Sequence, residues 1–213
     1  PSMYAAINQA PNVRAYGLDS IKACISGGAP LPVEVQESFE KLTQGRLSEG
    51  YGLTEASPVT HAHHLSGTSK IGSIGVPLPN TDARIVDLMT GDDVPPGQIG
   101  ELLIKGPQVM RGYWGASDDD HDAVIRAGWL STGDVAVMDG DGYFQIINRK
   151  RDTIMAGRHI VFPRDVEEVL YESNDVLEVA VAGVTNIEGG QRIKAFVVPR
   201  SGATPSKDDL LAL

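Results

Sequence analysis

The sequence predicts an α/β fold that continues into an antiparallel β unit and then into a small α+β domain. Three observations favour it. An apolar segment, a glycine-rich loop and an amphipathic helix follow one another before residue 46, the order of an α/β unit. Apolar stretches separated by turns dominate residues 71–148. A β-α-β pattern follows, so we expect an α/β part over 1–70, a β-rich part over 71–148 and a second domain over 149–213.

The α/β part begins with a strand expected at 21–25 (IKACI), short and buried. The loop SGGAP follows it. Helical periodicity starts at Pro32, and its apolar face is formed by Val35, Phe39 and Leu42. Gly45 is expected to end this helix, because glycine is the preferred residue just past a helix C-terminus.

In the β-rich part, we expect strands at 82–87, 99–104, 133–138 and 143–147. One helix is expected at 117–126, with Ser117 as its N-cap. Asp139–Gly142 (DGDG) resembles part of a calcium loop but lacks the later glutamate, so a hairpin turn is favoured.

In the last region, the sequence pattern predicts a helix that starts at Pro163 and strands at 176–184 and 192–199. It also predicts the beginning of a helix at 206–213. The apolar stripe of the first of these helices is formed by Val166, Val169 and Leu170.

Composition excludes several classes of protein. The net charge of −10 and the absence of a broad basic face argue against nucleic-acid binding. No apolar run approaches the roughly 18 residues of a membrane-spanning helix. The single cysteine, Cys24, cannot form an internal disulfide, so a cytoplasmic location is expected and Cys24 is interpreted as a core residue.

Two segments carry chemistry suited to a nucleotide. In Glu49–Glu55 (EGYGLTE), the Tyr51 ring suits a base, the Thr54 hydroxyl a phosphate, and the Glu55 carboxylate Mg²⁺. In isolation the same residues could be a core aromatic and a helix cap. The Gly27-Gly28 pair permits close approach of a flat ligand, although it lacks the ending of a phosphate-binding P-loop.

Two further groups of residues admit more than one interpretation. Asp134 could accept hydrogen bonds from ribose hydroxyls and Arg149 could approach the same sugar or a phosphate, yet the two could equally be a turn residue and a surface cation. His61, His63 and His64 lack a cysteine or carboxylate at metal-site spacing. We therefore interpret them as a polar loop beside an acyl tunnel rather than a zinc site.

Six segments in this order together resemble the adenylate-forming superfamily, and within it the bacterial long- or medium-chain fatty acyl-CoA ligases. They are SGGAPLP, EGYGLTEASP, GQIGELLIKGPQVMRGYW, GWLSTGD, NRKRDTI and FPRDVEEVL. The resemblance implies that the α/β and β-rich parts are the C-terminal portion of the large AMP-binding domain. Residues 149–213 would then be a hinge and part of the C-terminal lid domain.

The resemblance also implies roles for individual residues. Residues that would surround ATP or AMP are Gly27, Gly28, Ala29, Pro30, Gly50, Tyr51, Gly52, Thr54, Asp134, Ile146 and Arg149. Thr54 and Glu55 would be the catalytic residues, with Glu55 also the Mg²⁺ ligand. Arg151 falls at the hinge, and the loop at Gly157 would enter the site for transfer to CoA.

The activity implied is that of an AMP-forming fatty acid–CoA ligase. Its small-molecule substrates would be a fatty acid, ATP and CoA, and the resemblance also admits a homodimer and a peripheral membrane contact. Two alternatives stay open: acyl transfer to a carrier-protein thiol, and a non-catalytic nucleotide- or acyl-binding module. Asn148 and Ala156–His159 depart from the pattern of related ligases. The phosphate loop expected before Pro1 and the lysine expected after Leu213 are missing, so the chain is expected to be an inactive internal piece.

Overall fold

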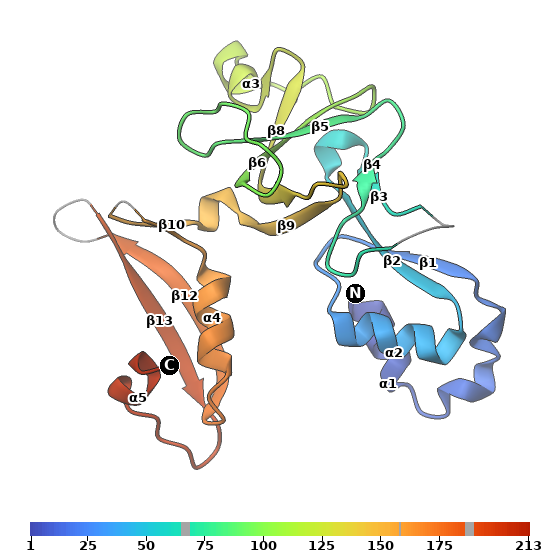
Figure 1. Cartoon of the computed structure of the whole chain (residues 1–213), viewed down its shortest axis with the longest axis vertical. Helices are drawn as coiled ribbons and strands as arrows, with labels where there is room; N and C mark the ends of the chain where they lie inside the picture. Colours follow the sequence, from blue (N-terminus) through green and yellow to red (C-terminus); the bar gives the residue numbers. More distant parts are fainter. Residues whose placement is uncertain (65–68, 158, 186–189) are drawn as a thin grey trace. The chain divides into compact units, whose positions relative to one another are not determined.

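The chain folds as two units, Pro1–Ile147 and Asn148–Leu213, in the computed structural model (Figure 1). The structure describes residues 1–64, 69–157, 159–185 and 190–213. Among the described residues, two packed apolar clusters lie in the first unit and one in the second, and each unit is described separately below.

The first unit begins with helices and a small sheet, followed by an antiparallel sheet. Its elements are α1 (Ser2–Gln9), η1 (Val13–Tyr16), η2 (Leu18–Ser20), β1 (Ala23–Ser26), α2 (Val33–Thr43), β2 (Arg46–Gly52), η3 (Thr54–Ala56), β3 (Val59–Ala62), β4 (Val76–Pro77), β5 (Asp82–Val86), β6 (Ile99–Lys105), α3 (Asp118–Val124), β7 (Ile125–Arg126), β8 (Trp129–Met138) and β9 (Phe144–Arg149), whose last residues belong to the second unit.

The first sheet has the order β1-β2-β3-β4, in which β1 and β2 are parallel and the later pairs antiparallel. The predicted strand at 21–25 is β1, two residues later, and the expectation that it is buried is wrong. Ile25 is 54% exposed because β1 lies at the edge of this sheet and alternates between its two faces. The strands β2 and β3 were not predicted.

Helix α2 covers this sheet through Phe39, which packs with Leu31 and Leu47. Cys24 packs at the edge of the same cluster, as predicted. The buried face differs from the expected one: Gln36 and Thr43 are buried beside Phe39, whereas Val35 and Leu42 are only partly buried. Both polar side chains satisfy backbone carbonyls, with Gln36 Nε2 2.7 Å from Leu47 O and Thr43 Oγ1 2.9 Å from Phe39 O. These bonds make their burial tolerable.

The expected role of Gly45 is also wrong. The residue that ends α2 in the left-handed conformation is Gln44, with φ of 56°. Glycine is needed at position 45 for another reason, since a Cβ there would lie 2.4 Å from the carbonyl oxygen of Ile21.

The second sheet has the order β5-β6-β8-β7, with β9 paired to β8. Its β5–β6, β6–β8 and β7–β8 pairs are antiparallel. This confirms the predicted antiparallel β unit and its strands. The helix predicted at 117–126 is α3, capped by Ser117, but it ends at Val124 because Ile125 and Arg126 pair with β8. The apolar cluster of this unit includes Ile85, Leu102, Ile104, Ala136 and Phe144.

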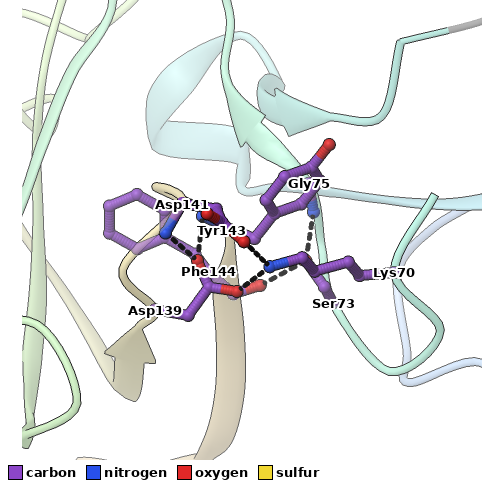
Figure 2. A network of polar contacts seen from close by, with 7 residues as sticks. All are labelled: Lys70, Ser73, Gly75, Asp139, Asp141, Tyr143 and Phe144. Carbon is purple, nitrogen blue, oxygen red and sulfur yellow. Dashed lines mark hydrogen bonds and ion pairs between the residues drawn. The ribbon is translucent and has the colours of Figure 1, made fainter. Parts of the chain in front are cut away.

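A polar network joins the segment before β4 to the hairpin between β8 and β9 (Figure 2). The amine of Lys70 lies 2.5 Å from an Asp139 carboxylate oxygen and 2.7 Å from one of Asp141, and 4.7 Å from the centre of the Tyr143 ring. The Asp139 amide donates to Tyr143 O and the Gly142 amide to Asp139 O, which confirms the predicted hairpin turn. The network fixes where β9 begins.

The second unit packs one helix against a strand pair (Figure 1). Its elements are η4 (Lys150–Asp152), β10 (Ile154–Ala156), β11 (His159–Val161), α4 (Pro163–Tyr171), β12 (Val176–Thr185), β13 (Gln191–Pro199) and α5 (Lys207–Leu211). The predicted helix starts and strands are confirmed, with Pro163 in the first turn of α4 and Ser206 capping α5. In the predicted stripe, Leu170 and Val166 join the core, but Val169 is 40% exposed.

Candidate nucleotide site

The glycine-rich loop and the EGYG segment lie side by side because their strands are neighbours. Ser26 of β1 pairs with Glu49 of β2 in parallel register, so the chain leaves both strands at the same edge of the sheet. In α/β sheets this edge, at the carboxyl ends of parallel strands, is where ligands bind. Glu49 supports the loop directly, since its Oε1 accepts a hydrogen bond from the Leu31 amide at 3.3 Å.

Glycine is required at Gly52, and the backbone also approaches closely at Gly27. A Cβ on Gly27 would lie 3.3 Å from Gly50 O, and one on Gly52 would lie 2.1 Å from Pro58 O. Gly28 has φ of +82°, which strongly favours glycine. The four predicted loop residues Gly27, Gly28, Ala29 and Pro30 are exposed, so their backbone is accessible to a flat ligand.

Tyr51 and Asp134 are brought into direct contact although 83 residues separate them. The Tyr51 hydroxyl donates to Asp134 Oδ2 at 2.5 Å. Asp134 is only 2% exposed and lies in β8, where its amide donates to Thr132 Oγ1 at 3.1 Å. Thr132 in turn donates to Leu102 O at 2.8 Å. Two residues proposed for one nucleotide are therefore parts of a single bonded cluster.

His61 packs behind Tyr51, so the expectation that all three histidines form a polar loop is wrong for His61. His61 is fully buried in β3, opposite Tyr51, and its ring makes edge contacts with Tyr51 at 5.9 Å and Phe144 at 4.8 Å between centroids. Burial lowers the pKa of His61 to about 4. His63 is buried as well and bonds Ser73 O at 2.7 Å. His61 and His63 therefore pack in the interior, whereas His64, beyond the end of β3, is exposed as a loop residue would be.

Glu55 and Thr54 lie together in η3, immediately after β2. Thr54 is exposed and Glu55 is half-buried. The Tyr113 hydroxyl donates to Glu55 Oε1 at 2.5 Å, and this bond raises the pKa of Tyr113 above its ordinary value. Tyr113 was missed by sequence reasoning as a site residue. It stands in the GQIGELLIKGPQVMRGYW segment, but no pattern in that segment indicates that it reaches Glu55.

No group of three or more potential metal ligands occurs among the residues that the structure describes. The single carboxylate of Glu55 does fit Mg²⁺, because that ion is commonly held by one or two carboxylates together with substrate phosphates and water. Glu55 supplies that carboxylate, and the Thr54 hydroxyl lies beside it in the same helical turn, where it could face a phosphate.

The remaining predicted residues have different surroundings. Ile146 of β9 packs against the apolar cluster of the first unit, which Tyr51 also contacts. Arg149, Arg151 and Gly157 belong to the second unit. Arg149 and Arg151 are exposed, and Arg151 lies 3.6 Å from Asp152. Gly157, with φ of +65°, forms the turn between β10 and β11.

A hollow of about 520 Å³ in the second unit is lined by both signs of charge. Its charged residues are Arg151, Asp152, Arg164 and Glu167. Glu167 and Gln191 already accept backbone amides, from Val181 and Met155 respectively. No single ligand chemistry follows from this lining.

Comparisons with known proteins identify the family. Residues 1–114 match the family model of AMP-binding enzymes, and residues 165–213 match that of the AMP-binding enzyme C-terminal domain. The chain belongs to the AMP-binding enzyme family.

Similarity extends over both units. The chain is 50% identical to a long-chain-fatty-acid–CoA ligase of Bacillus subtilis (strain 168), covering 99% of the chain and 37% of that relative. It is 41% identical to a feruloyl-CoA synthase of Amycolatopsis sp, covering 100% of the chain and 43% of that relative. It also resembles the ATP-bound structure of MatB from Rhodopseudomonas palustris, with a TM-score of 0.77, 29% identity, and coverage of 99% of this chain and 45% of that one. The chain thus spans less than half the length of these relatives.

Within the described residues, no helix is both long and apolar enough to cross a membrane.

Proposed function

We propose that this chain belongs to an AMP-forming fatty acid–CoA ligase. In the first step the fatty acid carboxylate attacks the α-phosphate of ATP, giving acyl-AMP and releasing pyrophosphate. In the second step the CoA thiol attacks the acyl carbonyl and AMP leaves. The 50% identity to a long-chain-fatty-acid–CoA ligase over nearly the whole chain supports this activity.

The observation that carries the proposal is the hydrogen bond between Tyr51 and Asp134. It links the EGYGLTE segment to the GWLSTGD segment beside the exposed glycine loop. We infer that adenine lies between the Gly27–Pro30 backbone and the Tyr51 ring, with Gly50 and Gly52 permitting the approach. Asp134 would accept hydrogen bonds from the ribose hydroxyls. Because Asp134 is buried and bonded to Tyr51, the ribose would share or replace the Tyr51 hydroxyl as donor.

Thr54 and Glu55 are proposed to act on the phosphates. The Thr54 hydroxyl would donate to a phosphate oxygen and Glu55 would hold Mg²⁺. When bound there, the ion would neutralise charge on the phosphates as pyrophosphate departs. The protein's own contribution is positioning, since the attacking carboxylate and the leaving pyrophosphate must lie in line.

In the second unit, Arg149 is proposed as a ribose or phosphate donor, Arg151 as the hinge, and the Gly157 turn as the segment that assists thioester formation. Gly157 lies in a turn with a left-handed backbone conformation, and the exposed Arg151 lies in the short helix η4. Both positions suit segments that move during the reaction. Ile146 would contribute an apolar contact beside the nucleotide.

Both a fatty acid and ferulate are tested as the acid, because one relative is a long-chain-fatty-acid–CoA ligase and another a feruloyl-CoA synthase. A cytoplasmic location accords with the single cysteine. A homodimer and a peripheral membrane contact belong to the proposal and can be tested by sedimentation and by vesicle flotation.

The test uses the 213-residue chain and the longest polypeptide that its gene encodes, in parallel. Each is incubated with ATP, Mg²⁺ and a fatty acid or ferulate, with CoA or an acyl carrier protein as acceptor. The expected result for the longest polypeptide that the gene encodes is AMP, pyrophosphate and acyl-CoA. Acyl transfer to the carrier protein alone would favour the carrier-loading alternative. Nucleotide binding without AMP formation would favour a non-catalytic module.

A further inference from the structure

The segment that follows β6 returns to Glu55 and contacts it at two points. The Met110 amide donates to the Glu55 carbonyl at 2.7 Å, and the Tyr113 hydroxyl donates to Glu55 Oε1 at 2.5 Å. Val109 packs against the apolar cluster of the first unit. The backbone that carries Tyr113 to Glu55 is therefore anchored by contacts other than the phenol.

The Tyr113 ring itself is not part of the core. Its residue is 52% exposed, and it belongs to none of the apolar clusters among the described residues. Removing the hydroxyl should therefore leave packing nearly unchanged. What the hydroxyl does contribute is an oriented donor to the carboxylate.

We propose that Tyr113 is a positioning residue that holds the Glu55 carboxylate in the orientation required to take up Mg²⁺ with a nucleotide. This inference rests on the proposed function of Glu55. A phenol is a neutral donor, so it restrains the carboxylate without cancelling its charge. A free glutamate loses several rotamers on binding a ligand, and a restrained one has already lost them.

The test compares Tyr113→Phe with Tyr16→Phe in the longest polypeptide that the gene encodes. Tyr16 is the matched control because it is 72% exposed in η1, away from the Glu55 segment. Binding of Mn²⁺, used as the probe for Mg²⁺, is measured by electron paramagnetic resonance in the presence of ATP. ATP binding without metal is measured by calorimetry in EDTA, and unfolding of each variant by urea.

The Tyr113→Phe variant should bind Mn²⁺–ATP about three- to tenfold more weakly, the size expected for ordering one side chain. Its affinity for ATP in EDTA and its urea midpoint should match those of the wild type and of Tyr16→Phe. Unchanged or tighter Mn²⁺ binding would overturn the inference, because the hydroxyl would then be neutral or a competitor of the ion. Equal losses with and without metal would also overturn it, since they indicate a structural role. If the wild type bound no ATP, the proposed function would fail, and the inference with it.

Discussion

Replacing Asp134 by Asn changes the residue that links the two nucleotide-binding segments. The amide is isosteric and can still accept from the Tyr51 hydroxyl, so the 2.5 Å contact and the fold should survive. In the Asp134→Asn variant, the ribose hydroxyls of a bound nucleotide would lose their charged hydrogen-bond acceptor. A hydrogen bond to a charged group contributes about 1.5–3 kcal/mol, so the affinity for AMP should fall about 10- to 150-fold. Isothermal calorimetry with AMP on the longest polypeptide that the gene encodes measures this loss.

Tyr51→Phe separates ribose binding from the internal hydrogen bond. It removes the donor to Asp134 but keeps the carboxylate and an aromatic face for adenine. Stability should fall by about 1–3 kcal/mol because a buried carboxylate loses a partner. AMP affinity should change by less than about threefold if the ribose supplies a replacement donor. Equal losses of AMP affinity in Asp134→Asn and Tyr51→Phe would refute the reasoning, since the internal bond and not ribose contact would then control binding.

Three further predictions concern other residues. Glu55→Gln should depress ATP–pyrophosphate exchange by about tenfold or more while AMP affinity, measured by calorimetry, stays within about threefold; comparable losses would contradict a role through Mg²⁺. Burial lowers the pKa of His61 to about 4 from 6.5. Between pH 6.5 and 4, the His61 imidazole is therefore protonated in the unfolded chain but stays neutral in the folded chain. Stability should fall between pH 6.5 and 4 by up to about 3 kcal/mol from this group, and His61→Gln should remove that part of the pH dependence in urea unfolding. Limited proteolysis should cut first near residues 148–152, and an earliest cut within 100–135 would argue against the proposed domain division.

The regular elements were predictable where a local pattern sufficed. Ser117 forms the expected helix cap, and the helix expected to begin at residue 206 starts with a similar cap at Ser206, since each serine precedes an aspartate by three residues. Short apolar stretches separated by turns located β5, β6 and β8. Local patterns could not locate β2, because Arg46–Gly52 carries a polar, glycine-rich sequence that is a strand only through its pairing with β1 and β3. The same limit explains why the buried face of α2 was not predicted. Burial of the polar Gln36 requires a hydrogen bond to the Leu47 carbonyl, 11 residues away in the sequence.

Sequence motifs were sufficient to single out the residues of the candidate site. They did not predict the hydrogen bonds between those residues. Tyr51, Glu55 and Asp134 were singled out because their side chains suit a base, a metal and a ribose. Their actual partners come from distant strands and loops: Tyr51 bonds Asp134, and Glu55 bonds Tyr113. A sequence pattern gives residue types and spacing along the chain, but hydrogen bonds across more than 50 residues depend on how the sheets pack.

The most direct test of the proposed chemistry follows the oxygen atoms of the acid. A fatty acid labelled with ¹⁸O in its carboxylate is incubated with ATP, Mg²⁺, CoA and the longest polypeptide that the gene encodes, and the products are analysed by mass spectrometry. If the carboxylate attacks the α-phosphate, one ¹⁸O atom must appear in AMP when CoA displaces it. Label found in inorganic phosphate together with ADP, or AMP without label, would contradict an acyl-adenylate intermediate and the ligase activity proposed for this chain.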